Sequence, residues 1–87
     1  MEFEQLRAFV AVAETGSFTR AAERLYTSHS SISRAVSALE RELGVTLIER
    51  DNRVLGLTKA GEILLEGAKD MLDREKKLKT EITKSTE

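Results

Sequence analysis

The sequence has 87 residues, of which 40% are hydrophobic and 33% are charged, and its formal net charge is −1. A chain of this length builds a single small core, and its apolar content excludes an intrinsically disordered chain. It has no cysteine and only one histidine, which excludes disulfide scaffolds and metal sites rich in cysteine or histidine. No apolar run reaches the ~18 residues that a membrane span needs, and no secretory signal opens the sequence, so we expect a cytoplasmic protein without membrane contacts.

Two helices are predicted at the start of the chain. From about residue 2 to 15, apolar side chains recur every three or four positions, which is the period of a helix that packs one face on a core. Gly16 fits the position that ends a helix, and Ser17 fits the N-cap of the next one, whose short apolar stripe ends at Leu25. Because only Gly16 and Ser17 join them, we expect the two helices to pack at a defined angle.

A third helix is predicted over about residues 28–43, after a polar turn. Thr27 or Ser28 fits its N-cap, and Gly44 fits its end. Its apolar residues fall at i, i+3, i+4, i+7 and i+11 and form one stripe that we expect to be buried, made of Ile32, Ala35, Val36, Leu39 and Leu43. A helix, a short polar turn and a second helix make the helix-turn-helix pattern.

A hairpin is predicted after this helix. Residues 45–48 and 54–57 are rich in β-forming side chains, and residues 51–53 between them favour a turn. An isolated hairpin is marginally stable in water, so we expect this wing, over about residues 47–57, to lean on the helices through Leu47 and Leu57.

The rest of the sequence predicts one long helix that begins at Thr58 and carries two apolar stripes. The first contains Leu64, Ala68, Met71, Leu78 and Ile82 and is interrupted by Glu75, and the second contains Leu65 and Leu72. One small domain cannot bury both stripes, so we expect at least one of them to pack against a second chain. The predicted fold class is mainly α, with a winged helix-turn-helix domain at residues 1–58 and a linker helix at residues 59–87.

The aromatic residues lie on or next to the apolar stripes. We expect Phe3, Phe9 and Phe18 to pack in the core rather than to stack on nucleic-acid bases. Tyr26 lies at the end of the second helix, so we expect its ring to pack and its hydroxyl to stay in water.

Enzymatic functions are excluded by the inventory of residues. His29 is the only imidazole, and no glycine pattern makes a phosphate-binding loop. Carboxylate pairs such as Glu40 and Glu42 stand among compensating basic residues, so we expect them on solvated helix surfaces. We expect neither a cofactor nor a metal ion.

The exposed side of the third helix favours double-stranded DNA as the partner. Between Thr27 and Leu39 the sequence has one charged residue, Arg34, and no acid. A helix that enters the major groove must present a slim face without carboxylates, because the phosphates repel them. Arg34 can donate two hydrogen bonds to a guanine, and the candidate contacts on this helix are Ser28, His29, Ser30, Ser31, Ser33, Arg34 and Ser37. For Ser28 we favour helix capping over base contact, whereas for His29 a base contact and plain exposure are equal alternatives.

Four more residues are candidates for DNA contacts outside this helix. Arg53 at the hairpin tip fits the minor groove or a flanking phosphate. Arg50 fits either DNA or an ion pair with an adjacent acid, which would contribute only about 0–1 kcal/mol. Thr19 and Arg20 fit a phosphate contact where the second helix crosses the DNA backbone.

Several runs of this sequence match one family pattern in register. They are Leu6–Phe9, Ala13–Phe18, Ala21–Leu25, Ser28–Arg34, Leu39–Gly44 and Leu47–Arg50, followed by Arg53, Leu57–Thr58 and Ala60–Gly61. Each run alone is weak, but together they cover most of the chain and are highly specific. By these runs the sequence resembles the N-terminal DNA-binding region of LysR-type transcriptional regulators, a bacterial winged helix-turn-helix group.

The resemblance implies how the chain meets DNA. The third helix would read the major groove, and the wing would touch the minor groove or the backbone. Two linker helices would pack antiparallel and form a homodimer on an interrupted palindrome. The DNA contacts carried over by position are His29, Ser30, Ser31, Ser33, Arg34, Arg50 and Arg53, and the linker-helix residues expected at the dimer interface are Leu64, Leu65, Ala68, Met71, Leu72, Leu78 and Ile82.

Two differences from the family leave alternatives open. The family commonly has Gln-Pro where this chain has His29-Ser30, so the base that this position prefers is open. Family members also continue into an effector-binding domain that this sequence lacks, so we expect either a piece of a longer regulator, with its inducer acting through the missing domain, or a stand-alone regulator. Whether the full-length assembly is a dimer or a tetramer is open as well. The alternative function is a winged helix that binds only proteins, which the net charge of −1 supports.

Overall fold

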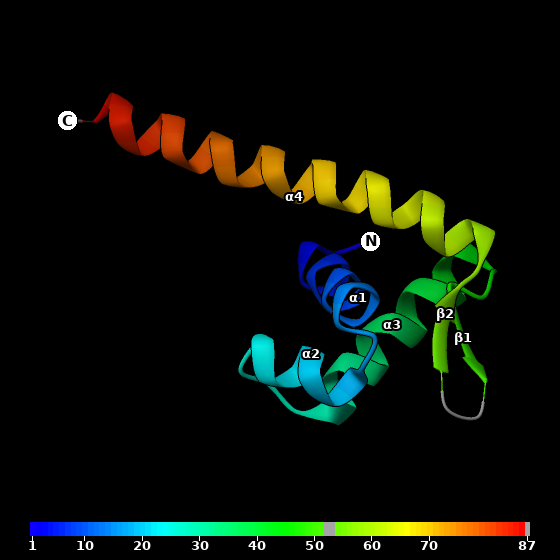
Figure 1. Cartoon of the computed structure of the whole chain (residues 1–87). Coiled ribbons are helices and arrows are strands. Elements are labelled where there is room, and N and C mark those ends of the chain that lie inside the picture. The colour runs from blue at the N-terminus through cyan, green and yellow to red at the C-terminus, as the bar shows by residue number, and fades with distance from the viewer. Residues whose placement is uncertain (52–53, 87) are drawn as a thin grey trace.

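The computed structural model describes residues 1–51 and 54–86. Its elements are α1 (Phe3–Thr15), α2 (Phe18–Arg24), α3 (His29–Leu43), β1 (Ile48–Asp51), β2 (Val54–Leu57) and α4 (Lys59–Ser85). The strands pair antiparallel, with Ile48 opposite Leu57, and form the wing. Figure 1 shows α1 between α4 on one side and α2 with α3 on the other, while the wing runs down from the start of α4. The predicted mainly α fold, a winged helix-turn-helix followed by a long helix, is confirmed.

Hydroxyl side chains cap the starts of three helices, as the sequence predicts. Each accepts a hydrogen bond from the backbone N–H three residues later: Ser17 from Arg20 at 3.1 Å, Ser28 from Ser31 at 3.1 Å and Thr58 from Gly61 at 3.0 Å. Gly16 and Gly44 end α1 and α3 with φ of 69° each, a left-handed conformation that glycine adopts without a steric penalty.

The end of α2 differs from the sequence prediction. The N–H of Thr27 donates to the carbonyl of Ala22 at 2.9 Å, and this bond closes the helix around Tyr26, whose φ is 55°. Glycine is usual at such a left-handed helix end, because a side chain there is strained. The Tyr26 side chain is 97% exposed, so the expectation that its ring packs is wrong.

The core lies where α1 crosses α3 and the start of the wing. Its largest fully buried side chains are Phe9, Leu6, Ile32, Leu39, Leu47, Ile48, Val12 and Val36. The wing leans on the helices as predicted, since Leu47 is buried and Leu57 packs against the same cluster. Phe3 and Leu43 were also expected to be buried, and that is wrong, because the described elements leave the first turn of α1 and the last turn of α3 partly uncovered.

The first strand begins at Ile48, not at Val45 as β propensity suggests. The N–H groups of Leu47 and Ile48 donate to the Glu40 carboxylate at 2.8 and 3.3 Å. The carbonyl of Leu47 accepts the N–H of Thr58 at 3.0 Å. The backbone of this segment is therefore hydrogen-bonded to α3 and to the start of α4. Because these bonds replace pairing with the second strand, β1 begins only at Ile48.

The first turn of α4 sits directly on the wing at Gly61. A methyl group added to Gly61 would overlap the carbonyl oxygen of Leu47 and lie 3.1 Å from its carbonyl carbon. The Thr58 hydroxyl also donates to the carbonyl of Thr46 at 2.6 Å. Glycine at position 61 thus allows two backbones to touch, and this contact fixes where α4 leaves the domain.

Only one side of α4 packs on the domain. Ala68 is completely buried, and Leu64, Leu65 and Leu72 are half-buried against the core. The side chain of Ala68 is enclosed by its own domain, whereas its place in a dimer interface stays a prediction. Glu75, which interrupts the apolar stripe, pairs with Arg7 of α1 at 3.3 Å. Among the residues that the structure describes, none of the helices combines the length and apolar character that crossing a bilayer demands.

Candidate nucleic-acid interface

The face of α3 opposite the core is polar and carries two arginines. Ser30, Arg34, Ser37 and Arg41 follow one another at i, i+4, i+7 and i+11, so they form a single row along the helix. Ser30, Arg34 and Arg41 are exposed, and Ser37 is half-buried. Neither arginine pairs with a carboxylate among the side chains that the structure describes. The sequence interpretation missed Arg41, although its position seven residues after Arg34 puts it on the same face.

The first turn of α3 is organised by hydroxyl groups. The Ser28 hydroxyl accepts the N–H of Ser31 and donates to the Ser31 hydroxyl at 2.9 Å, and it lies 3.2 Å from the Ser30 hydroxyl. Ser28 therefore caps the helix, which is the role that we favoured for it. Its lone pairs and proton are used within the turn, whereas the exposed hydroxyl of Ser30 lies on the outward row.

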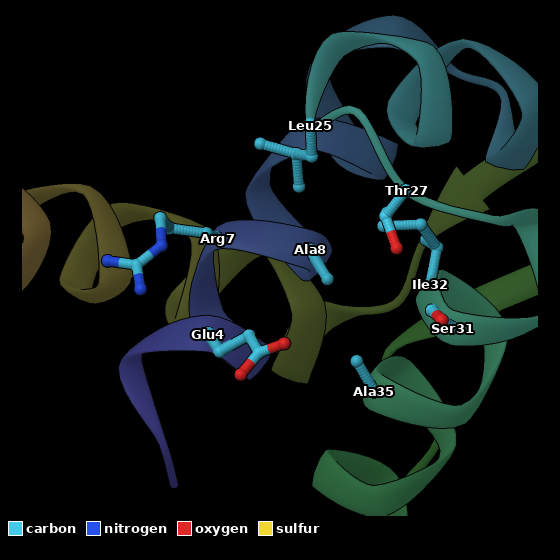
Figure 2. Close-up of a pocket in the computed structure, with 8 residues that line it drawn as sticks. All are labelled: Glu4, Arg7, Ala8, Leu25, Thr27, Ser31, Ile32 and Ala35. Atoms are coloured by element: carbon cyan, nitrogen blue, oxygen red, sulfur yellow. The ribbon is translucent and has the colours of Figure 1, made fainter.

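Ser31 belongs to a different side of α3 from the outward row. It lines a cavity of about 160 Å³ between α1, the end of α2 and α3, whose walls are Glu4, Arg7, Ala8, Leu25, Thr27, Ser31, Ile32 and Ala35. Figure 2 shows the Glu4 carboxylate turned toward α3, while the Arg7 side chain extends away from the cavity. Because an acid lines the same cavity as Ser31, a phosphate is disfavoured there, and Ser31 is a weaker candidate than Ser30. Ser33 is half-buried, one turn after Ser30.

The Phe18 ring connects α2, α3 and the wing. Its centroid lies 5.6 Å from that of the His29 ring, and the Arg50 guanidinium lies over it at 5.0 Å. Phe18 is half-buried and packs against the core, as expected, but its outer side carries these two polar neighbours. This contact joins the start of α2 to the first turn of α3, and Thr19 and Arg20, which follow Phe18 in α2, are exposed.

Arg50 lies on the face of the wing that looks toward the helices. In a strand, residues two apart share a face, so Arg50 follows the buried Ile48 and lies opposite the half-buried Leu55. The Glu40 carboxylate lies 4.0 Å from the Arg50 guanidinium and also accepts the N–H groups of Leu47 and Ile48. The Glu40 side chain is 17% exposed, so the expectation of a solvated surface position is wrong for this residue.

Of the side chains that the sequence predicts to meet DNA, Ser30, Arg34 and Ser37 share the outward row of α3, whereas Ser31 lines the cavity on another side of the helix. The row on α3 supplies hydrogen-bond donors, and the described part of the wing supplies Arg50 beside it. Arg53, expected at the tip, lies outside the described residues. Such a surface can cover a major groove and the adjacent backbone.

Comparison with known families gives one match over most of this chain. Residues 3–62 match the family described as bacterial regulatory helix-turn-helix protein, lysR family. The chain belongs to the LysR family. The match includes α1, α2, α3, the wing and the first turn of α4, and therefore contains all the elements that build the surface described above.

Curated relatives in this family are named as transcriptional regulators. The chain is 49% identical over 73 residues to the HTH-type transcriptional regulator TcbR of Pseudomonas sp. (strain P51), covering 84% of this chain and 25% of that protein. It is 49% identical over 74 residues to the Hca operon transcriptional activator HcaR of Escherichia coli (strain K12), covering 85% and 25% respectively. The chain thus spans about a quarter of the length of these relatives.

Solved structures with the same fold include complexes with DNA. The DNA-binding domain of CbnR in complex with DNA superposes with a TM-score of 0.91 and 41% identity, and the match covers all of both chains. The DNA-binding domain of BenM bound to the benA site 1 DNA gives a TM-score of 0.93 and 35% identity, covering 99% of this chain and 97% of that one.

Proposed function

We propose that this chain binds double-stranded DNA sequence-specifically as the DNA-binding region of a bacterial LysR-type transcriptional regulator, a binding module rather than an enzyme. The observation that carries the proposal is the acid-free row of Ser30, Arg34, Ser37 and Arg41, flanked by Arg50 on the wing. In this arrangement α3 enters the major groove, and the wing lies over the adjacent minor groove or backbone. The protein acts in the cytoplasm, where its operator is found.

The contacting residues divide by chemistry into base readers and phosphate binders. Arg34 lies mid-way along the row and is long enough to donate two hydrogen bonds to a guanine, with Ser30, Ser37 and the first-turn His29 beside it. Thr19, Arg20 and Arg50 lie on other elements and are assigned to phosphates, which fix the register without reading sequence. Arg53, which lies outside the described residues, is assigned to the same group from its place in the sequence. Arg41, at the far end of the row, joins the phosphate group.

A homodimer is the second part of the proposal. Ile63, Met71, Leu78 and Ile82 are 64%, 37%, 46% and 57% exposed on α4, although all are large apolar side chains. Met71, Leu78 and Ile82 follow the half-buried Leu64 at spacings of seven and four residues and so form one stripe along α4, and Figure 1 shows the C-terminal end of the helix running beyond α1. We propose that a second copy of α4 packs antiparallel on this stripe. The inducer of the full-length protein then acts through the part of the regulator beyond this chain.

Selection from random duplex DNA tests the proposal. The 87-residue chain is mixed with a duplex library, bound DNA is amplified and sequenced, and retention is compared at two salt concentrations. We expect an enriched interrupted palindrome whose affinity falls steeply with salt, because each neutralised phosphate releases counterions. An enriched single half-site would overturn the dimer and keep the DNA reader. No enrichment and no salt-sensitive binding would leave a protein-interaction module as the better explanation.

A further inference from the structure

We propose that Phe18 and Glu40 are positioning residues that hold Arg50 for its contact with DNA. Through them the wing and α3 would contact DNA in a fixed relative position. The inference rests on the proposed DNA binding and adds residues that do not themselves touch DNA. The inference starts from the position of Arg50, the wing arginine that the structure describes. Its side chain lies between the wing and the helices, next to Phe18 and Glu40.

The Phe18 ring and the Glu40 carboxylate hold the guanidinium of Arg50 from two directions. The Cζ atom of Arg50 lies over the Phe18 ring at 5.0 Å from its centroid, within the range of a cation–π contact. The carboxylate oxygen Oε1 of Glu40 lies 4.0 Å from one guanidinium nitrogen. The contact with Glu40 involves one guanidinium nitrogen, so the N–H donors on the other nitrogens of Arg50 are available for a phosphate.

Each positioning residue is itself fixed by the fold. Glu40 is bound through Oε2 to the N–H groups of Leu47 and Ile48 at 2.8 and 3.3 Å, so the same carboxylate holds the start of the wing and its arginine. Phe18 packs on the core and touches the His29 ring at 5.6 Å. The wing arginine and the first turn of α3 therefore share one aromatic support, and a displacement of either side chain changes the surroundings of the other.

The direction in which Glu40→Gln changes the affinity for DNA tells whether Glu40 positions Arg50 or acts only through its negative charge. Glu40→Gln removes a negative charge beside the DNA surface while its amide oxygen still accepts the two backbone N–H groups. If Glu40 acted only by its charge, this variant would bind every DNA more tightly. If Glu40 positions Arg50, the variant binds the selected operator more weakly. Glu49→Gln is the matched control, since Glu49 is adjacent in sequence, exposed, and on the opposite face of the strand from Arg50.

The experiment is a set of double-mutant cycles on the 87-residue chain, with affinity measured on the selected operator and on unrelated duplex. Phe18→Leu and Glu40→Gln are each made alone and together with Arg50→Ala. We expect each single change to weaken operator binding about 2- to 10-fold, in the range of a lost cation–π or oriented ion-pair contact. In the Arg50→Ala background we expect each loss to shrink to less than about 2-fold, because the arginine that they position is gone. Phe18→Tyr, which keeps the ring, should restore wild-type affinity.

Several outcomes would overturn the inference. Equal losses with and without Arg50 would mean that the two residues act only through stability, and thermal unfolding of each variant checks that reading directly. Tighter operator binding by Glu40→Gln, matching Glu49→Gln, would leave only the charge effect. If Phe18→Leu does not fold, the cycle between Glu40 and Arg50 still decides. If the wild-type chain binds no DNA, the proposed function itself is refuted. If it binds DNA but the effects of the substitutions simply add, only the positioning role is refuted.

Discussion

Replacing Gly61 with alanine should loosen the junction between the wing and α4. The new methyl group would overlap the carbonyl oxygen of Leu47, which belongs to the backbone and cannot rotate aside. The first turn of α4 must therefore move outward. That movement strains the bond from the N–H of Thr58 to the carbonyl of Leu47, now 3.0 Å long.

The magnitude follows from three opposing effects. Overpacking at a tight backbone contact costs about 1–3 kcal/mol, and a weakened hydrogen bond costs about 1 kcal/mol more. Alanine gains about 1 kcal/mol over glycine in a helix, which offsets part of the loss. We expect Gly61→Ala to lower the free energy of unfolding by about 2 kcal/mol, equivalent to a fall in Tm of about 8–16 °C for a domain of this size.

Gly67→Ala is the matched control on the same helix. Nothing lies within 4 Å of a methyl group added at Gly67, so only the helix-propensity gain should appear there. We expect this variant to gain up to about 1 kcal/mol. Urea unfolding followed by circular dichroism, at one protein concentration for all variants, measures both. Equal stabilisation by the two substitutions would refute the tight contact between Gly61 and Leu47.

Three further outcomes are expected. Arg34→Ala should weaken operator binding by about 1–3 kcal/mol and relax the preference at one base pair, which repeated selection with the variant would reveal, and an unchanged base profile would remove Arg34 from the base readers. Tyr26→Gly should raise the free energy of unfolding by up to about 1 kcal/mol, because glycine adopts the positive φ without strain and the exposed ring has no packing to lose, and chemical denaturation that shows a loss would contradict this. Changing Met71, Leu78 and Ile82 together to glutamine should give monomers in analytical ultracentrifugation with the helical signal retained, whereas dimers of this variant would place the interface elsewhere.

The sequence predicts most of the fold here because the signals are local. Ser17, Ser28 and Thr58 cap helices where hydroxyl residues precede apolar stripes, and Gly16 and Gly44 end helices where the period breaks. Each of these signals depends on neighbours within one turn, so it can be read from the chain without knowing what packs against it.

The parts that could not be predicted depend on contacts between distant segments. Glu40 resembles any surface glutamate until the wing folds back and presents two N–H groups to it, and those same bonds move the start of β1 to Ile48. Ala68 fits an apolar stripe equally well whether a partner chain or its own core covers it. Tyr26 sits where the fold demands a left-handed residue although the sequence supplies no glycine.

The helix that carries the candidate DNA surface could be predicted from the sequence, but the contacts between its side chains and those of the wing could not. The outward row on α3 follows from helical spacing, and Arg41 could have been included by continuing that spacing from Arg34. The role of Phe18 could not be foreseen, because an apolar side chain beside a helix start predicts core packing. Only the folded wing shows that its outer side supports Arg50.

The contact between Gly61 and the Leu47 carbonyl fixes the angle at which α4 leaves the domain. In a dimer joined through α4, this angle sets the distance between the two DNA half-sites. The 27 residues of α4 extend about 40 Å. Because about 36 Å of the helix lie beyond Gly61, a tilt of about 5° there moves the far end by about 3 Å, close to the ~3.4 Å rise of one base pair. In a dimer joined through two such helices, small substitutions at this contact would change the number of base pairs between half-sites while every DNA-contacting side chain stayed the same.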